Sequence, residues 1–167
     1  MNTNQKLGPR VAMLLIAGLL LVLPDPASAQ ARRGNDRPRV VRELPRDNVA
    51  IRVGARPYHY SGGVFYRRSG PGYVVVAAPR GAVVRTLPRA YVTLRIGSRT
   101  YYRFGTVFYV RVDGGYQVVT PPPGGTVDML PVGYETVYVD GEAFYVHEGV
   151  WYRYDPGRDV YVTVEEP

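Results

Sequence analysis

The sequence has no cysteine, only two histidines, and no long apolar run beyond the one near its start. Without cysteine the chain forms no disulfides and has no thiolate metal ligands, no cysteine nucleophile and no cysteine for lipid attachment. Histidine, the commonest general acid or base, is scarce. We therefore expect stability to come from packing alone, and few residues are candidates for catalysis.

Residues 1–29 have the composition of a secretory signal peptide. Two basic residues precede an apolar run of 13 residues, Val11–Leu23, and Ala27 and Ala29 supply small residues just before Gln30. These are the three parts of a cleavable signal. The alternative is an uncleaved membrane anchor, which needs about 20 apolar residues. We therefore expect export to the periplasm or the cell exterior, and no transmembrane span in the mature chain.

Residues 30–43 are basic and contain few apolar residues, as is typical of a disordered leader. They carry five arginines against Asp36 and Glu43. Such arms bind anionic polymers. In an exported protein the available polyanions are lipid headgroups, lipopolysaccharide and cell-wall polymers, so nucleic acid is not an expected partner.

Three tandem repeats follow, and each begins with a Leu-Pro pair. The pairs start at Leu44, Leu87 and Leu130, so the period is constant at 43 residues. Self-similarity at a fixed period of this length indicates a repeat architecture. We define repeat 1 as residues 44–86, repeat 2 as 87–129 and repeat 3 as 130–167.

Within each repeat apolar and polar residues alternate, as Val92, Leu94 and Ile96 show in repeat 2. Alternation indicates a half-buried strand, and the Gly97-Ser98 pair that follows is typical of a hairpin turn. An aromatic strand, a strand with a Val-aromatic-Tyr triplet and a fourth strand come next. We expect an antiparallel meander of four short strands in each repeat and no helix.

One aromatic residue in the third strand of each repeat is predicted to anchor the core: Phe65, Phe108 and Trp151. Such a ring buries roughly 150–250 Å². A unit of 43 residues is near the size at which a chain struggles to fold alone, so the repeats should pack on one another. Propellers have about four or more blades. The predicted fold is therefore all-β, either an open stack or a compact sandwich or barrel-like domain.

The repeats differ strongly in charge. Repeat 1 has seven arginines and one acid, repeat 2 has five and two, and repeat 3 has two and eight, which gives net charges of +6, +3 and −6. Such a gradient can steer one molecule's C-terminal end to another's N-terminal end, or bring repeats 1 and 3 together. Head-to-tail self-association is one hypothesis. The alternative is neutral drift of surface charges, since a surface ion pair contributes at most about 1 kcal/mol.

Several short motifs recur: tyrosine pairs, Gly-x-Phe-Tyr, Tyr-x-Val-Val, Pro-Pro-x-Gly and Leu-Pro-x-Gly-Tyr. They are carried by Tyr101, Tyr102, Val107, Phe108, Tyr109, Gly115, Tyr116, Val118, Val119, Pro121, Pro122, Gly124, Leu130, Pro131, Gly133 and Tyr134. Over about residues 44–163 the combination resembles a family of exported bacterial proteins known only as a domain of unknown function. The sequence departs from that pattern at Ala78, where proline is expected, and at Arg89 and Ala90. The resemblance implies a cell-envelope β-repeat protein and supplies no catalytic residues.

The remaining polar residues do not form a convincing catalytic or metal-binding set. His59 stands where the other repeats have tyrosine, and His147 lies in a turn, whereas a catalytic base needs a partner and a pocket. Asp140, Glu142 and Glu148 are too loosely spaced around His147 for a metal site. We therefore predict no catalytic residues, no metal, no cofactor and no enzymatic activity.

Fifteen tyrosines are the distinctive feature of the sequence. Alternation along a strand must turn some of them outward, and exposed tyrosine and arginine side chains can stack on sugars or pair with anionic groups. We predict a ligand surface that includes Tyr58, Arg99, Tyr101 and Arg103. The other interpretation is core or sheet-face packing.

Two hypotheses about function remain. The first is a structural or interaction protein of the bacterial cell envelope, which works through its β-repeat surfaces and exposed strand edges and has a protein partner. The second is a module that binds cell-wall or surface polysaccharide through outward tyrosine and arginine residues.

Overall fold

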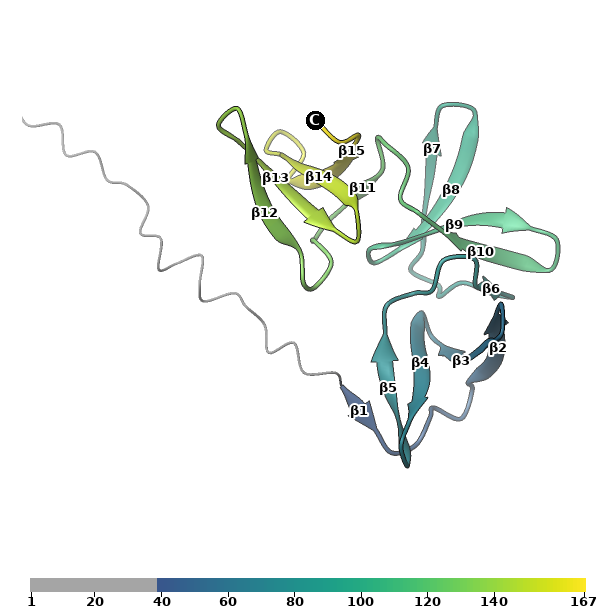
Figure 1. Ribbon diagram of the computed structural model, residues 1–167. Helices are drawn as coiled ribbons and strands as arrows, with labels where there is room; N and C mark the ends of the chain where they lie inside the picture. The colour runs from purple at the N-terminus through teal and green to yellow at the C-terminus, as the bar shows by residue number, and fades with distance from the viewer. Residues whose placement is uncertain (1–38) are drawn as a thin grey trace, which may run out of the picture. The chain divides into compact units, whose positions relative to one another are not determined.

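The computed structural model describes residues 39–167, and their regular structure consists of β-strands. The strands form three antiparallel sheets of five strands each (Figure 1). Within these residues no helix is long and apolar enough to cross a membrane. The predicted signal peptide and residues 30–38 of the predicted leader lie outside the described residues.

The first sheet contains β1 (Val40–Val41), β2 (Val49–Val53), β3 (Arg56–Ser61), β4 (Val64–Ser69) and β5 (Gly72–Val76). The second contains β6 (Val83–Val84), β7 (Val92–Ile96), β8 (Arg99–Phe104), β9 (Val107–Val112) and β10 (Gly115–Val119). The third contains β11 (Thr126–Val127), β12 (Glu135–Val139), β13 (Glu142–His147), β14 (Val150–Asp155) and β15 (Val160–Val164). The prediction of three all-β meander repeats is confirmed, and the sheets do not close into a barrel.

Each sheet has one strand more than the predicted four. The strand order is β1-β5-β4-β3-β2, with the same order in the other two sheets, so a two-residue strand pairs with the last strand of each meander. These short strands come from the residues just before each Leu-Pro pair. They satisfy backbone groups of β5, β10 and β15 that would otherwise form an open sheet edge.

This fifth strand crosses two of the predicted boundaries. Val40–Val41 lies within the predicted disordered leader, but it forms β1 and pairs with β5. Val83–Val84 belongs to repeat 1 by sequence, but it forms β6 and pairs with β10 of the second sheet. A two-residue strand is too short to show alternation, so the sequence pattern did not reveal it.

The first hairpin of each sheet closes as predicted through a residue with positive φ. Gly97 (φ 58°) begins the turn between β7 and β8, and Asp140 (φ 50°) takes the same place between β12 and β13. A two-residue hairpin turn of this type needs positive φ, which glycine adopts freely and aspartate tolerates better than most residues. The turn chemistry therefore fixes the register of each meander.

Each sheet has two faces that we name after the residues in its third meander strand. The Phe face carries Phe65, Phe108 or Trp151, and the Tyr face carries Tyr66, Tyr109 or Tyr152. These residues are neighbours in β4, β9 and β14, and successive side chains in a strand point to opposite faces. Both faces of the second sheet are buried, because Phe108 and Tyr109 are each 0% exposed.

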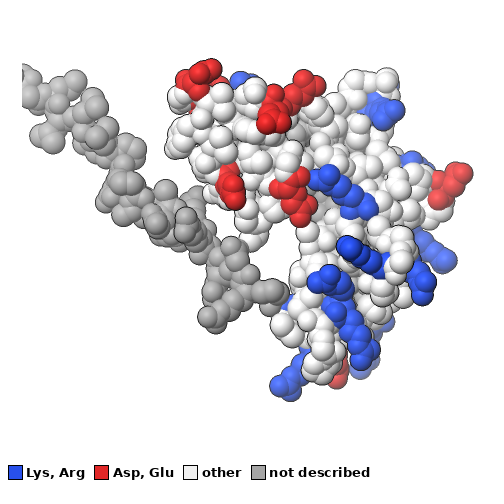
Figure 2. Space-filling view, viewed as in Figure 1, with Lys and Arg blue, Asp and Glu red and all other residues white. Residues whose placement is uncertain are grey.

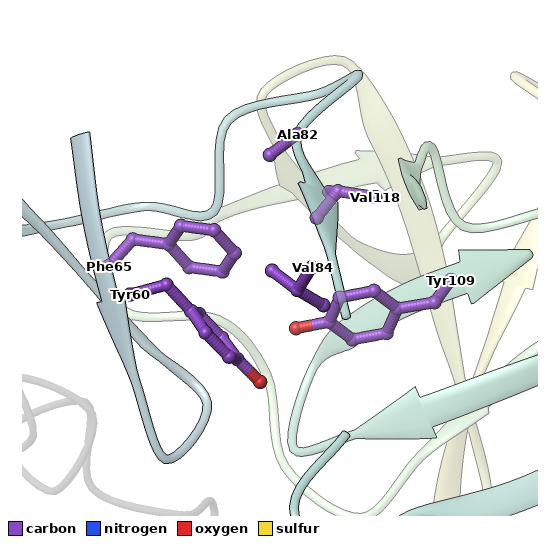
Figure 3. Packing of buried hydrophobic residues seen from close by; sticks show 6 residues of the cluster. All are labelled: Tyr60, Phe65, Ala82, Val84, Tyr109 and Val118. Atoms are coloured by element: carbon purple, nitrogen blue, oxygen red, sulfur yellow. The ribbon is translucent and has the colours of Figure 1, made fainter. Parts of the chain in front are cut away.

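The sheets stack with the Phe face of one against the Tyr face of the next. Tyr60 and Phe65 of the first sheet form one core with Val84, Tyr109 and Val118 of the second sheet (Figure 3). A second core joins Phe108 of the second sheet to β11 and β14 of the third. The same contact is thus made twice within the chain, as in other repeat proteins.

The predicted core anchors differ in burial. Phe65 and Phe108 are 2% and 0% exposed, whereas Trp151 is half-buried. The difference follows from the stacking direction. The Phe faces of the first two sheets are covered by the next sheet, and among the described residues no sheet covers the Phe face of the third.

Candidate functional site

The four residues predicted as a ligand surface do not lie together on an exposed surface. Arg99, Tyr101 and Arg103 alternate along β8 on the Phe face of the second sheet, and Tyr58 lies on the Phe face of the first. Tyr58 and Arg103 are buried, and Tyr101 packs against the core between the second and third sheets. Of the four, only Arg99 is exposed, because the next sheet covers this face.

Arg103 has a structural partner in the neighbouring sheet. Its Nη1 donates to Asp128 Oδ2 at 3.1 Å and to the carbonyl oxygen of Gly105 at 2.9 Å, and its Nη2 donates to Asp128 Oδ2 at 3.2 Å. Asp128 directly follows β11, the short strand that the connector adds to the third sheet. The guanidinium therefore links two sheets and is not free for a ligand.

A group of packed rings lies on the Tyr face of the second sheet. Tyr102 meets Tyr91 edge to face at 5.8 Å between ring centroids and meets Tyr116 at 5.0 Å. The guanidinium of Arg111 lies 5.6 Å from the centroid of Tyr116 and donates to its hydroxyl at 3.2 Å. Edge-to-face pairs contribute about 0.5–1.5 kcal/mol beyond their buried area.

The first sheet carries a polar version of this group. His59 takes the place of the central tyrosine and meets Tyr73 edge to face at 5.3 Å. Its Nδ1 lies 2.9 Å from Asn48 Oδ1, so the imidazole donates and the amide oxygen accepts. His59 therefore packs and bonds within the sheet, which agrees with its position as a replacement for tyrosine.

The corresponding group on the Tyr face of the third sheet contains five tyrosines. We call it the tyrosine surface: Tyr134, Tyr138, Tyr145, Tyr154 and Tyr161. Ring centroids are 5.6 Å apart for Tyr134 and Tyr145, and 5.3 Å apart both for Tyr145 and Tyr161 and for Tyr154 and Tyr161. Tyr138 is 72% exposed, and Tyr134 and Tyr154 are 40% and 41% exposed. Tyr134 belongs to a recurring sequence motif, and none of the five is among the predicted ligand residues.

The strands of the third sheet hold the tyrosine surface in place. Tyr154 and Tyr161 are direct partners across β14 and β15, and the Tyr154 hydroxyl donates to Asp159 Oδ1 at 2.6 Å. That hydrogen bond raises the pKa of Tyr154, and burial raises the pKa of Tyr145. These two phenols are therefore neutral at physiological pH and present ring faces and hydroxyl groups rather than charge.

A cleft of about 730 Å³ lies where hairpin turns of the three sheets come together. It is lined mainly by valine, alanine, proline and phenylalanine, and Arg80, His147 and Glu148 contribute polar atoms. Arg80 Nη2 donates to the carbonyl oxygen of Glu148 at 2.9 Å. In residues 39–167 no hydrogen bond joins the side chains of His147 and Glu148, so the cleft contains both residue types without an acid–base pair.

The acids considered for a metal site lie at opposite ends of β13. Asp140 and Glu142 lie at the turn before this strand, and His147 and Glu148 lie at its other end. Among the described residues no group of three or more potential metal ligands comes together.

The family comparison covers nearly all of the described structure. The model of a protein family of unknown function, DUF6515, matches residues 38–166. The chain belongs to this family. The match spans every strand of the three sheets, so all three repeats are part of the DUF6515 domain. No curated protein and no solved structure gives a significant match to the chain.

Proposed function

We propose that this DUF6515 chain is an exported, non-catalytic binding protein of the bacterial cell envelope whose ligand is a cell-wall or surface polysaccharide. Export is supported by the charged start, the apolar run of 13 residues and the small residues before Gln30. The ligand class rests on one observation, the tyrosine surface of the third sheet.

The tyrosine surface has the properties that sugar binding requires. Ring contacts hold Tyr134, against Tyr145, and Tyr154, against Tyr161, in fixed orientations. Tyr134, Tyr138 and Tyr154 remain exposed. A tyrosine ring offers a flat apolar face for the C–H face of a sugar, and its hydroxyl can hydrogen-bond to sugar hydroxyls. Immobilised rings lose little conformational entropy on binding, which favours affinity.

The charge of repeat 3 narrows the ligand class. This repeat has a net charge of −6, and Figure 2 shows acidic side chains gathered over the third sheet while basic ones lie over the first two. A field of this sign repels anionic polymers. The polysaccharide is therefore neutral or carries amino sugars, in contrast to the anionic ligand that the predicted arginine surface would have favoured.

The absence of catalysis is part of the same proposal. Its support is that His59 is bonded to Asn48 and that His147 and Glu148 line the cleft without bonding to each other. A general acid or base needs an oriented partner near a bound substrate. The cleft is then a gap between the packed repeats rather than a catalytic site.

The experiment is a pull-down of the chain on purified peptidoglycan and on a neutral polysaccharide at low and high salt. Replacing Tyr138 and Tyr154 by alanine should weaken retention about tenfold or more, which corresponds to about 1.4 kcal/mol. Tyr91→Ala is the matched control, because Tyr91 is as exposed as Tyr154 but lies on the second sheet. Retention that salt abolishes, or an equal loss in the control, would contradict the proposal.

A second candidate function is a structural or interaction protein that works through its sheet faces. The observation that favours it is the Phe face of the third sheet, which nothing in residues 39–167 covers, whereas its equivalents on the first two sheets each bind a neighbouring sheet.

A further inference from the structure

The Phe face of the third sheet is the one Phe face without an occupant among the described residues. Its Trp151 is half-buried and meets Phe144 edge to face at 6.0 Å between ring centroids. The same face carries six half-buried valines: Val137, Val139, Val146, Val160, Val162 and Val164. The equivalent aromatic residues Phe65 and Phe108 are fully buried because another sheet covers them.

Acidic residues appear on this face where the other Phe faces have none. Glu135 and Glu142 are exposed and share the face with Phe144 in the register of β12 and β13. The equivalents of Glu135 are Val49 and Val92, and the equivalents of Glu142 are Arg56 and Arg99, each 43 or 86 residues earlier in the sequence. The face also carries the exposed Arg153, and Asp155, which pairs with Arg158. Its acids still outnumber these two arginines, so the face has a net negative charge that the two covered faces lack.

The Tyr face of the first sheet is the complementary unoccupied surface. The Tyr faces of the second and third sheets each receive the preceding Phe face, and among the described residues no sheet packs on the first. It carries Arg52 and Arg68, both exposed. The third sheet has Tyr138 and Tyr154 at these positions. The Tyr face of the first sheet therefore carries positive charge that the Tyr face of the third sheet lacks.

We propose that the Phe face of the third sheet binds the Tyr face of the first sheet in a second copy of this chain. The contact repeats the one that the chain makes twice internally, and the two end faces carry opposite charges. This inference rests on the second candidate function and does not need glycan binding. A head-to-tail contact that does not close on itself produces linear assemblies.

The intermolecular contact is weaker than the two internal ones. On the Tyr face of the first sheet, the Asn48–His59 pair stands where the other sheets have two tyrosines, and the Ser61 hydroxyl donates to Asp47 Oδ1 at 2.7 Å. These polar groups offer less apolar area to a partner, and burial of apolar area contributes only about 25 cal/mol per Å². Assembly is therefore reversible and depends on concentration and salt.

Sedimentation velocity of the full chain over a wide concentration range tests this contact. The wild type should associate, more strongly at low salt. The variant Glu135→Arg with Glu142→Arg and the variant Arg52→Glu with Arg68→Glu should each weaken association about tenfold or more, because like charges then meet. An equimolar mixture of the two variants should associate again, because opposite charges meet at every contact.

The same experiment has clear contrary outcomes. A wild type that is monomeric at all concentrations would overturn the proposal, and so would an Arg52→Glu, Arg68→Glu variant that associates like the wild type. All four side chains are exposed, so circular dichroism should show unchanged folding. Each variant keeps residues 1–29, so aggregation through the apolar run would not respond to the substitutions. Tyr138→Ala should leave association intact, which separates this test from glycan binding.

Discussion

Phe108 and Tyr109 are adjacent in β9, yet their rings belong to two different cores. Phe108 packs against the third sheet, with Val127, Val150 and Tyr152, and Tyr109 packs against the first sheet, with Tyr60 and Phe65. One dipeptide therefore holds three repeats together. The alternation of side chains across a strand makes this possible, because the second sheet is buried on both faces.

The first prediction compares equivalent aromatic residues in different sheets. Phe108→Ala should lower the free energy of unfolding by about 3–5 kcal/mol, as expected for a fully buried ring. Trp151→Ala should cost less in the monomer, although tryptophan is larger, because its face is uncovered. Urea denaturation at low protein concentration measures both. Equal losses would show that the face of Trp151 is covered in the free chain.

The second prediction concerns a buried hydroxyl group. Within the described residues the Tyr109 hydroxyl is buried and has no hydrogen-bond partner, and burial raises its pKa. Figure 3 shows it directed toward Tyr60, whose own hydroxyl donates to the carbonyl oxygen of Thr86 at 3.3 Å. Removing an unpaired buried hydroxyl is neutral or favourable, by up to about 1–3 kcal/mol, whereas removing a bonded one costs about 0.5–1.5 kcal/mol.

We therefore expect Tyr109→Phe to raise the unfolding free energy or leave it unchanged, and Tyr60→Phe to lower it. Thermal denaturation of the two variants in the same buffer is sufficient for the comparison. The opposite ranking would mean that the Tyr109 hydroxyl has a partner in solution.

The third prediction concerns the ion pair between sheets. Asp128→Asn removes the charge that faces the buried Arg103 guanidinium. The side chain of Asp128 is 70% exposed, so water screens the pair and the expected loss is only about 1–2 kcal/mol. Asp155→Asn breaks an exposed pair with Arg158 and serves as the control, with no measurable loss expected. If both variants behave alike, Arg103 does not need its partner.

The sequence predicts the meander well and the stacking poorly. Alternation in residues such as Val92, Leu94 and Ile96, together with the turn at Gly97, is local information, and the structure confirms it. Which face of a sheet is covered depends on how the repeats pack, and periodicity within one strand does not encode that. For this reason the alternation predicts a ligand surface at Tyr101 and Arg103, although they lie at a covered interface.

The tyrosine surface was missed for the same reason, although a sequence signal for it exists. Tyr138 stands 43 residues after Arg95, and Tyr154 stands 43 residues after Arg111. A change from arginine to tyrosine at two positions of one repeat marks a local difference in surface chemistry. Its meaning becomes clear only when the register places both positions on the same face of the third sheet.

The fourth prediction is a loss of stability in alkaline solution. Burial and the nearby charge of Glu148 raise the pKa of Tyr152 from 10 to about 12, with Arg80 acting in the opposite direction. The folded state thus favours the neutral phenol. This contribution is complete below pH 10, where the phenol is neutral in both states, and it is lost as pH rises from 10 to 12, because the unfolded chain ionises first.

Because Glu148 is exposed and water screens its charge, we expect the loss to be about 1–2 kcal/mol rather than the full value for two pKa units. Urea denaturation between pH 8 and about pH 12 measures the slope. Tyr152→Phe cannot ionise and should flatten it, whereas Tyr138→Phe, which changes an exposed tyrosine, should leave it unchanged. An unchanged slope in Tyr152→Phe would mean that the alkaline loss comes from other buried tyrosines, with Tyr109 the first to test.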